Sequence, residues 1–555
     1  MSKRLIAVLL TICLMLTFMP TALTVSASSE SNTVPNYTDP WDKTKPIPDL
    51  TPVKDKDVDS IKFTGDEWTG KTVDGVRNEE VFAVNREEAS TFSTSGVIYD
   101  SVENAVIGAR DFKKEKSRFV QFLTGKDQAD WSLTVVKNDT VAQTDAYKDF
   151  YKVDYNGVNE ENNWKTGLQL PASWPYFGFD YPIYTNTQVP WQEDSTSSNT
   201  APLAPVNYNP VGMYRKTFTL NQGLKDAKGR IYINFQGVEA AYYVYVNGKE
   251  VGYSEDSYSP HSFDITDYLN MDGENLLAVK VHKFCDGTWF ELQDMFKDGG
   301  IFRDVYLYAA PLVHIDDYFV ITDLDENYEN ANLNLKVTVE NKSAEVASGY
   351  KIDVRLYDAE GNMFVNGVTA NVPSIDAATD EGPGSQTVNI SKTVLSPKLW
   401  SAEEPNLYTL VISLYQENGA YMGSMSQQLG FREIEFVRTE VNENGKRKTL
   451  DSEYKPITIN GQPLLFKGTN RHDTDPIYGK YVSHRVMEED VKLMKQFNIN
   501  AIRTSHYSND DYLYYLCDKY GLYMMAETNL ESHQLMNNGD KQKLFKELAM
   551  DRTIT

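Results

Sequence analysis

Three short clusters of polar residues near the C-terminal end, each with a histidine, are the part of this sequence that could do chemistry. Three of the chain's seven histidines, His472, His506 and His533, lie in these clusters. Each cluster follows an apolar stretch that predicts a short strand. A single histidine or glutamate in a loop is usually just solvated. Clusters at three equivalent positions instead indicate a functional site, because the carboxyl ends of parallel strands form the active-site face of a barrel.

The third cluster contains a pair of residues that could bind a metal ion. Glu531 and His533 are two residues apart, so their side chains face the same way in an extended segment. The carboxylate-rich surroundings favour Mg²⁺ or Mn²⁺, whereas Zn²⁺ would favour more histidine or cysteine ligands. Cys517 lies within a predicted helix beside Leu516, which indicates a core position and not a metal ligand.

The elements around these clusters alternate between strand and helix, which predicts parallel βαβ units. A (β/α)₈ barrel needs about 250 residues, and fewer than half of these remain after Phe436. Residues 436–555 are therefore expected to form the start of a TIM-barrel catalytic domain that is incomplete. The expected strands are 463–467, 499–503 and 522–526, and the expected helices are 485–497 and 510–520.

Two β-rich domains are expected before the barrel. Residues 76–311 contain short strands and tight turns, including the hairpin turn at Asn247 and Gly248, and predict a β jelly roll. Residues 312–435 alternate cleanly between apolar and polar positions and predict an immunoglobulin-like β-sandwich.

The N-terminal region resembles an export signal followed by a polar leader. Residues 1–27 carry Lys3 and Arg4, then an apolar run, then a small-residue cleavage site, so we expect a signal peptide and a secreted, extracellular product. A retained membrane anchor is the alternative. Residues 28–75 are rich in Asp, Pro, Thr and Lys and predict a flexible leader. Only Cys285 and Cys517 remain after cleavage, which is no disulfide framework.

Composition narrows the classes of partner. The chain has 555 residues, of which 41% are hydrophobic and 12% aromatic, and this excludes disorder over the whole chain. Its net charge of −25 argues against binding to nucleic acid or to an anionic membrane surface, because phosphate binding needs clustered Lys and Arg. Neutral substrates remain open. A homo-oligomer and retention of the exported protein at the cell surface both remain open.

Five motifs follow one another along the chain: GIFRDV at 300–305, PKLWSAEEPNLY at 397–408, NGQPLLFKGTNRH at 460–472, NAIRTSHY at 500–507 and ETNLESH at 527–533. In this order they resemble glycoside hydrolase family 2. Two further segments resemble the β-galactosidase branch of that family, namely YPIYTN at 181–186 and QDM at 293–295. The resemblance covers most of the chain from the expected jelly roll to the end.

The resemblance implies roles for particular residues. Two loops of the jelly roll would reach the galactose site, one with Asn186 and one with Asp294, and Asp294 would contact both the substrate and Na⁺. His472 and His506 would contact galactose hydroxyls. Glu531 and His533 would be Mg²⁺ ligands. The acidic run after His472 differs from the more histidine-rich loop of the family.

The resemblance also implies a retaining hydrolysis of terminal non-reducing β-D-galactose residues. One carboxylic acid protonates the leaving oxygen, and a second carboxylate attacks the anomeric carbon. Both family positions would lie beyond Thr555, so no residue of this chain is expected to be the acid/base or nucleophile, and the chain alone should not hydrolyse an aryl β-galactoside. The alternatives are a half-enzyme that needs a partner chain, and an inactive carbohydrate-binding protein.

Overall fold

The structure is a computed structural model that describes residues 89–90, 96–191, 201–435, 439–441, 447–449, 457–536, 538–543 and 545–554. The expected signal peptide and leader lie outside these residues. All the described residues belong to one compact unit, 39–555. No helix in the described ranges is long and apolar enough to cross a membrane.

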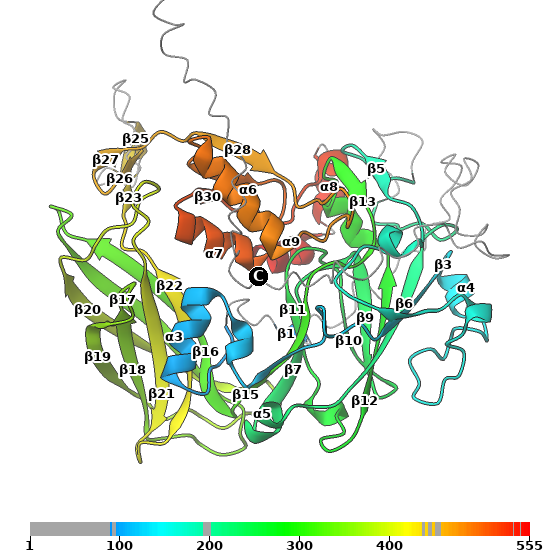
Figure 1. Ribbon diagram of the computed structural model, residues 1–555, viewed down its shortest axis with the longest axis horizontal. Coiled ribbons are helices and arrows are strands. Elements are labelled where there is room, and N and C mark those ends of the chain that lie inside the picture. Colours follow the sequence, from blue (N-terminus) through cyan, green and yellow to red (C-terminus); the bar gives the residue numbers. More distant parts are fainter. Residues whose placement is uncertain are drawn as a thin grey trace, which may run out of the picture. The chain divides into compact units, whose positions relative to one another are not determined.

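The first β-rich region is built from two antiparallel sheets that face a shared apolar core (Figure 1). Trp131, Tyr214 and Phe263 are fully buried in this core. The predicted hairpin is confirmed, since β9 and β10 are joined by Asn247 at φ 52° and Gly248 at φ 81°. Both residues therefore have the left-handed conformation that a type I′ turn requires. The first sheet has the order β1 (Ala89–Ser90), β11 (His261–Asp264), β7 (Arg230–Phe235), β15 (Val305–Ala310), β2 (Val120–Phe122), and the second β10 (Lys249–Ser254), β9 (Ala241–Val246), β12 (Asn275–His282), β6 (Val211–Phe218), β3 (Trp131–Val136), β4 (Lys165–Leu168).

Two small sheets lie beside this region. Three α-helices occur in the same described stretch of the chain, and the first of them packs on the sandwich that follows. The pair that matters for the site is β5 (Ile183–Thr185) with β13 (Met295–Lys297), because each strand carries one of the two segments that resemble substrate-reaching loops. The remaining elements are β8 (Val238–Glu239) with β14 (Gly300–Ile301), and the helices α3 (Val102–Asp111), α4 (Asp139–Ala142) and α5 (Gln222–Asp226).

The second β-rich region is a sandwich of a three-stranded and a four-stranded antiparallel sheet. The predicted alternation is confirmed on β17, where Leu333, Leu335, Val337 and Val339 are all buried. A bulge in β16 between Ile315 and Asp317 interrupts the pairing with β17. The sheets have the orders β16 (Val313–Leu324), β17 (Asn330–Asn341), β20 (Gly384–Leu395), and β19 (Met363–Val372), β18 (Tyr350–Tyr357), β21 (Tyr408–Gln416), β22 (Tyr421–Leu429).

The last region contains three parallel strands, where a complete (β/α)₈ barrel has eight. Both predicted helices are confirmed, and Figure 1 shows them in orange and red beside the strands. They pack on one face of the sheet, where Met487, Leu513 and Ile502 share a core. Cys517 is buried in that core, as predicted, and Cys285 is also a buried free thiol. The elements are β28 (Gly468–Arg471), α6 (His484–Gln496), β29 (Ala501–Thr504), α7 (Asp511–Tyr520), β30 (Tyr523–Met525), α8 (Gly539–Lys543) and α9 (Lys546–Ile554).

The prediction of a buried strand at 463–467 is wrong, because the first parallel strand is β28 and begins at Gly468. Leu465 and Phe466 are 68% and 48% exposed. The Asn500 side chain accepts a hydrogen bond from the Lys467 amide at 2.7 Å and donates one to the Leu465 carbonyl at 3.0 Å. Pro463 and Leu464 pair with the antiparallel segment at Ile457 and Thr458, and Asn500 holds the backbone from Leu465 to Lys467, so the segment is not a strand of the parallel sheet.

Short antiparallel strands connect the sandwich to the barrel. A three-stranded sheet precedes β28, and a two-stranded sheet lies in the same connection. These strands are β23 (Ile434–Glu435), β26 (Thr458–Ile459) and β27 (Gln462–Pro463), and β24 (Thr439–Val441) with β25 (Arg447–Thr449).

Candidate active site

The parallel pairing of β28, β29 and β30 brings the three predicted clusters to one edge of the sheet. Asn470 is in register with Arg503, and Arg503 with Met525. Residues that follow these positions therefore emerge together. The rings of His472 and His506 have centroids 5.4 Å apart.

Imidazoles and carboxylates alternate next to these two histidines. His506 Nδ1 lies 3.4 Å from Glu527 Oε2 and 3.9 Å from Glu531 Oε2. His533 Nδ1 lies 3.3 Å from Glu531 Oε1. The Arg503 guanidinium forms an ion pair with Glu527, so Glu527 is already held by a cation. The chain of groups from His472 to His533 is thus continuous, and it offers oxygen and nitrogen donors to a cation or to a hydroxylated ligand.

The two loops of the jelly roll meet the exit of the first barrel strand around a cavity of about 510 Å³. Asp294 precedes β13 and accepts a hydrogen bond from the Tyr184 hydroxyl of β5. Tyr184, Asp294, His472 and Lys480 all line this cavity. Side chains of both domains therefore share one space, whose size suits a small ligand.

The structure brings together most of the predicted site residues. Asp294 and His472 share the cavity, and the contacts described above link His472 through His506 and Glu531 to His533. Asn186 is exposed directly after β5 and does not line the cavity. Its proximity to Asp294 comes from the pairing of the preceding residue, Thr185, with Met295.

A buried polar cluster attaches the loop that carries Glu531 to the jelly roll. Asn529 is completely buried, and its Nδ2 donates to Asp256 and to Glu291 at 2.8 Å each. Its Oδ1 accepts from Gln293 at 2.7 Å. The amide of Glu531 donates to the Phe290 carbonyl at 2.8 Å. The position of Glu531 is therefore fixed by the β-rich region and not by the barrel strands alone.

Sequence reasoning missed a second buried group behind His472. Lys480 Nζ donates to Glu239 Oε1 and to the Tyr258 hydroxyl, both at 2.7 Å. The Tyr258 ring stacks on Tyr507 with centroids 3.9 Å apart, and the Tyr507 hydroxyl lies 3.4 Å from His472 Nδ1. The only sequence signal was that Tyr507 closes the NAIRTSHY motif.

This environment keeps His472 neutral. Burial lowers its pKa most, and the nearby His506 and Lys480 lower it further, while Asp294 acts in the opposite direction. Lys297 is fully buried beside the same site, and burial followed by repulsion from Lys480 lowers its pKa to about 8. A neutral imidazole can both donate and accept, which suits the recognition of a sugar hydroxyl.

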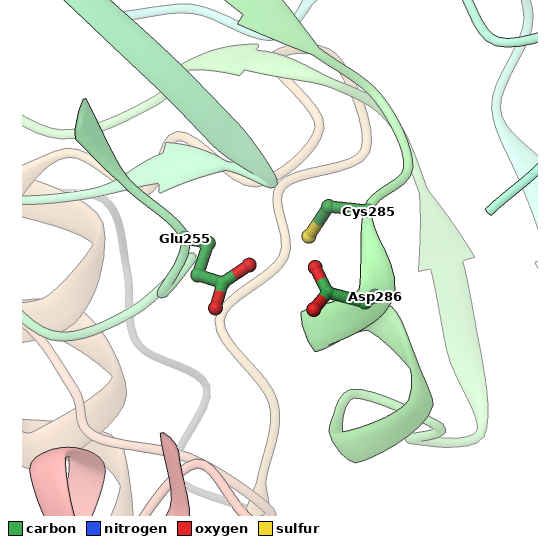
Figure 2. A group of neighbouring side chains, drawn as sticks. All are labelled: Glu255, Cys285 and Asp286. Carbon is green, nitrogen blue, oxygen red and sulfur yellow. The ribbon is translucent and has the colours of Figure 1, made fainter. Parts of the chain in front are cut away.

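The donors at Glu531 and His533 fit a divalent cation in type. Glu531 Oε2 is buried without a hydrogen bond in the described part of the chain, and an orphaned carboxylate oxygen of this kind favours a cation. Within the described ranges, two groups place three candidate ligand atoms within 4.8 Å of one another, and neither includes Asp294, Glu531 or His533. One is His314, Asp316 and Glu340. The other is Glu255, Cys285 and Asp286, whose side chains converge in Figure 2.

Three family models match successive parts of the chain. "Glycosyl hydrolases family 2, sugar binding domain" matches residues 141–311, "Glycosyl hydrolases family 2" matches 313–432, and "Glycosyl hydrolases family 2, TIM barrel domain" matches 451–554. Their order is that of the jelly roll, the sandwich and the parallel strands.

Curated relatives named β-galactosidase align with most of the chain. The protein of Priestia megaterium is 38% identical over 485 residues, which are 86% of this chain and 42% of the relative. That of Clostridium acetobutylicum is 36% identical over 462 residues, 83% of this chain and 45% of the relative. The chain thus spans less than half of their length. The solved structure of Bacteroides uniformis β-glucuronidase 2, covalently bound to cyclophellitol-6-carboxylate aziridine, shares the fold, with a TM-score of 0.54, 24% identity and coverage of 73% of this chain and 42% of that one.

Proposed function

We propose that this chain, which belongs to glycoside hydrolase family 2, supplies the galactose-binding part of a retaining β-galactosidase. The substrate would be a terminal non-reducing β-D-galactose residue. Two relatives that align with more than four-fifths of the chain are named β-galactosidase, and they are 38% and 36% identical to it.

The observation that carries the proposal is the shared cavity of Asp294 and His472. A jelly roll that only stabilised the barrel would not need to place a carboxylate at the strand exit. A carboxylate and a neutral imidazole facing one space can bind adjacent sugar hydroxyls, the first as acceptor and the second as donor or acceptor.

The chemistry would be the two-step displacement of retaining glycosidases. We assign neither of its catalytic carboxylates to a residue of this chain. Glu527 is held by Arg503, and Glu531, which has one buried carboxylate oxygen without a hydrogen bond, is the proposed metal ligand. The residues described here would bind and orient the galactose ring, and His506 would contact its hydroxyls next to His472.

We further propose Mg²⁺ as the ion at Glu531 and His533, and Na⁺ beside Asp294. A bound Mg²⁺ would supply positive charge next to the reacting sugar. The support is the buried free carboxylate oxygen of Glu531 beside His533, together with the resemblance of the ETNLESH motif to the magnesium-binding loop of the family. Export from the cell is proposed from the pattern of residues 1–27 alone.

The test is hydrolysis by the full-length protein that contains this chain. We expect activity on an aryl β-D-galactoside and much weaker activity on the matching glucuronide and mannoside. Asp294→Asn should lower kcat/KM for the galactoside by roughly 10- to 150-fold, since a hydrogen bond to a charged group contributes about 1.5–3 kcal/mol.

The matched control is Asp272→Asn, because the Asp272 side chain is 97% exposed in a distant turn. It should leave kcat/KM unchanged. Preferred hydrolysis of the glucuronide would refute the assignment of the substrate. Galactose binding without hydrolysis by the full-length protein would instead show a carbohydrate-binding protein.

A further inference from the structure

A second group of polar side chains lies far along the chain from the active site, at the start of the sandwich. It consists of His314 and Asp316 on β16 and Glu340 on β17. The last strand of the jelly roll, β15, ends at Ala310, so the group lies just past the connection between the two β-rich regions.

Backbone register explains why these three side chains converge. His314 is directly opposite Glu340 in the antiparallel pair, where side chains on one face are neighbours. The bulge between Ile315 and Asp317 leaves Asp316 without a partner on β17. A bulge of this kind redirects a side chain, and here one ligand atom from each residue lies within 4.8 Å of the others.

His314 is the observation that distinguishes this group from an ordinary acidic patch. The residue is 2% exposed, and neither ring nitrogen makes a hydrogen bond within the described residues. Buried polar groups are rarely left in that state, because each costs free energy until it finds a partner. Burial, with a further contribution from Lys342, lowers its pKa to about 3. A contact with the Pro311 carbonyl acts in the opposite direction, but its geometry does not meet that of a hydrogen bond. The ring is therefore neutral near pH 7 and has a lone pair to offer.

We propose that His314, Asp316 and Glu340 bind a divalent cation of the zinc class at the joint between the jelly roll and the sandwich. This site is separate from the proposed active site, and it does not depend on the proposed function. Its role is structural, since it joins the first residues of β16 to the last residues of β17.

The donor set determines the class of cation. One imidazole and two carboxylates suit Zn²⁺, whereas Ca²⁺ and Mg²⁺ prefer oxygen ligands alone. Metal–ligand bonds of about 2.1 Å would place the three ligand atoms about 3–4 Å from one another. These atoms already lie within 4.8 Å of one another, so small side-chain movements would complete the site. Asp316 and Glu340 are half-buried, which leaves room for water in the remaining positions.

The charges around the group leave it net negative. Lys342 is the facing cation, at 3.4 Å from Glu340 Oε2, but its Nζ also donates to the Tyr232 hydroxyl of β7 at 2.7 Å. Asp317 is an additional exposed carboxylate on the same strand. Burial, then Glu340, raises the pKa of Asp316 to about 6, and Lys342 opposes this. Two carboxylates thus face one ammonium, and a divalent cation would offset the excess.

The other three-residue group does not support the same inference. Glu255, Cys285 and Asp286 lie beside Arg552, whose Nη2 donates to the Glu255 carbonyl at 2.7 Å (Figure 2 shows the three side chains). A Cβ on the intervening Gly287 would be 3.0 Å from Arg552 Nη2 and 3.3 Å from Cys285 Sγ. The guanidinium therefore already brings a positive charge to that group.

The test is Zn²⁺ binding by the protein after treatment with a chelator. Calorimetric titration is done in excess Mg²⁺ and in a Glu531→Gln background, so that the proposed active-site position does not contribute. We expect one Zn²⁺ to bind and to raise the melting temperature. Asp316→Asn should weaken binding by roughly tenfold or more, and so should His314→Gln.

The matched control is Asp317→Asn, one residue away and exposed, which should bind Zn²⁺ like the parent. Asp316→Asn preserves size and lies at a half-buried position, so it should fold even where the His314 variant does not. Equal affinity in the Asp316→Asn and Asp317→Asn proteins would overturn the proposal. The proposal would also be overturned if the Cys285→Ser protein no longer bound Zn²⁺ while the Asp316→Asn protein still did.

Discussion

Replacing Arg552 with Met should destabilise the attachment of the barrel segment to the jelly roll more than any surface charge would. The Arg552 side chain is fully buried, and its Nη2 lies 2.9 Å from Glu291 Oε1. Nη1 donates to the Asn529 carbonyl at 2.9 Å, and Nε lies 3.9 Å from Asp256 Oδ2. Met fills a similar volume but leaves two buried carboxylates without this cation.

The expected loss is about 3–5 kcal/mol at pH 7, the cost of removing one partner from a buried ion pair. It should depend on pH. Burial acts to raise the pKa of Asp256, but Arg552 and His261 outweigh it, so the pKa is lowered. A carboxyl with a lowered pKa stabilises the fold above its unfolded pKa of about 4, and this contribution is lost as the pH falls through the folded value. Without Arg552 the pKa of Asp256 should rise, so the difference between variant and parent should shrink as the pH falls from 7 toward 5.

The assay is urea unfolding followed by tryptophan fluorescence at several pH values. Trp289 is fully buried in the core that also contains Leu548 of α9, so it reports on this attachment. Arg485→Met is the control, because Arg485 forms an i,i+4 pair with the exposed Glu489. It should cost less than about 1 kcal/mol. Equal losses in the two variants, or a loss at Arg552 that does not vary with pH, would refute the reasoning.

Two further predictions concern the site itself. Glu531→Gln in the full-length protein should raise the Mg²⁺ concentration needed for half-maximal activity by roughly tenfold or more. The control Glu547→Gln, at an exposed position, should not change it. Unchanged Mg²⁺ activation in the Glu531 variant would refute the assignment of Glu531 as a metal ligand. Gly479→Ala should lower the melting temperature by several degrees, because φ is +69° and the new Cβ would lie 2.6 Å from Asp298 Oδ2. Gly419→Ala is the control, because φ is +83° there and no atom lies within 4 Å of the new Cβ, so it measures the cost of the backbone conformation alone. Equal falls in melting temperature for the two variants would argue against a steric clash at Gly479.

The elements that were predicted well from the sequence are those whose conformation is determined by their own residues. The hairpin turn at Asn247 and Gly248 is local, and so is the end of the helix expected at 510–520, which Gly521 closes in a left-handed conformation. The strand predicted at 463–467 failed for the opposite reason. Its apolar residues gave a local pattern of burial, but the partner of its backbone from Leu465 to Lys467 is Asn500, which pattern reasoning does not associate with it.

In the candidate site too, the features set by local sequence were predicted and the long-range contacts were not. The strand exits placed His472, His506 and Glu531 near one another from order and spacing alone. The buried contacts that hold them could not be predicted, because they join residues far apart in sequence. Asn529 is 273 positions from Asp256, and Lys480 is 222 positions from Tyr258. Neither pair belongs to a short motif that composition or periodicity can detect.

These contacts also argue against reading the two β-rich regions as an independent sugar-binding protein. Glu239 and Glu291 of the jelly roll are buried, and their closest cations are Lys480 and Arg552 of the barrel segment. A buried carboxylate that loses its cation costs several kcal/mol. The jelly roll in this form therefore needs the first strands and helices of the barrel, because they neutralise its buried acids. The buried contacts of Arg552 and Asn529 also hold the loop that carries Glu531 against the jelly roll, so the β-rich region and the barrel segment form one structural unit at the candidate site.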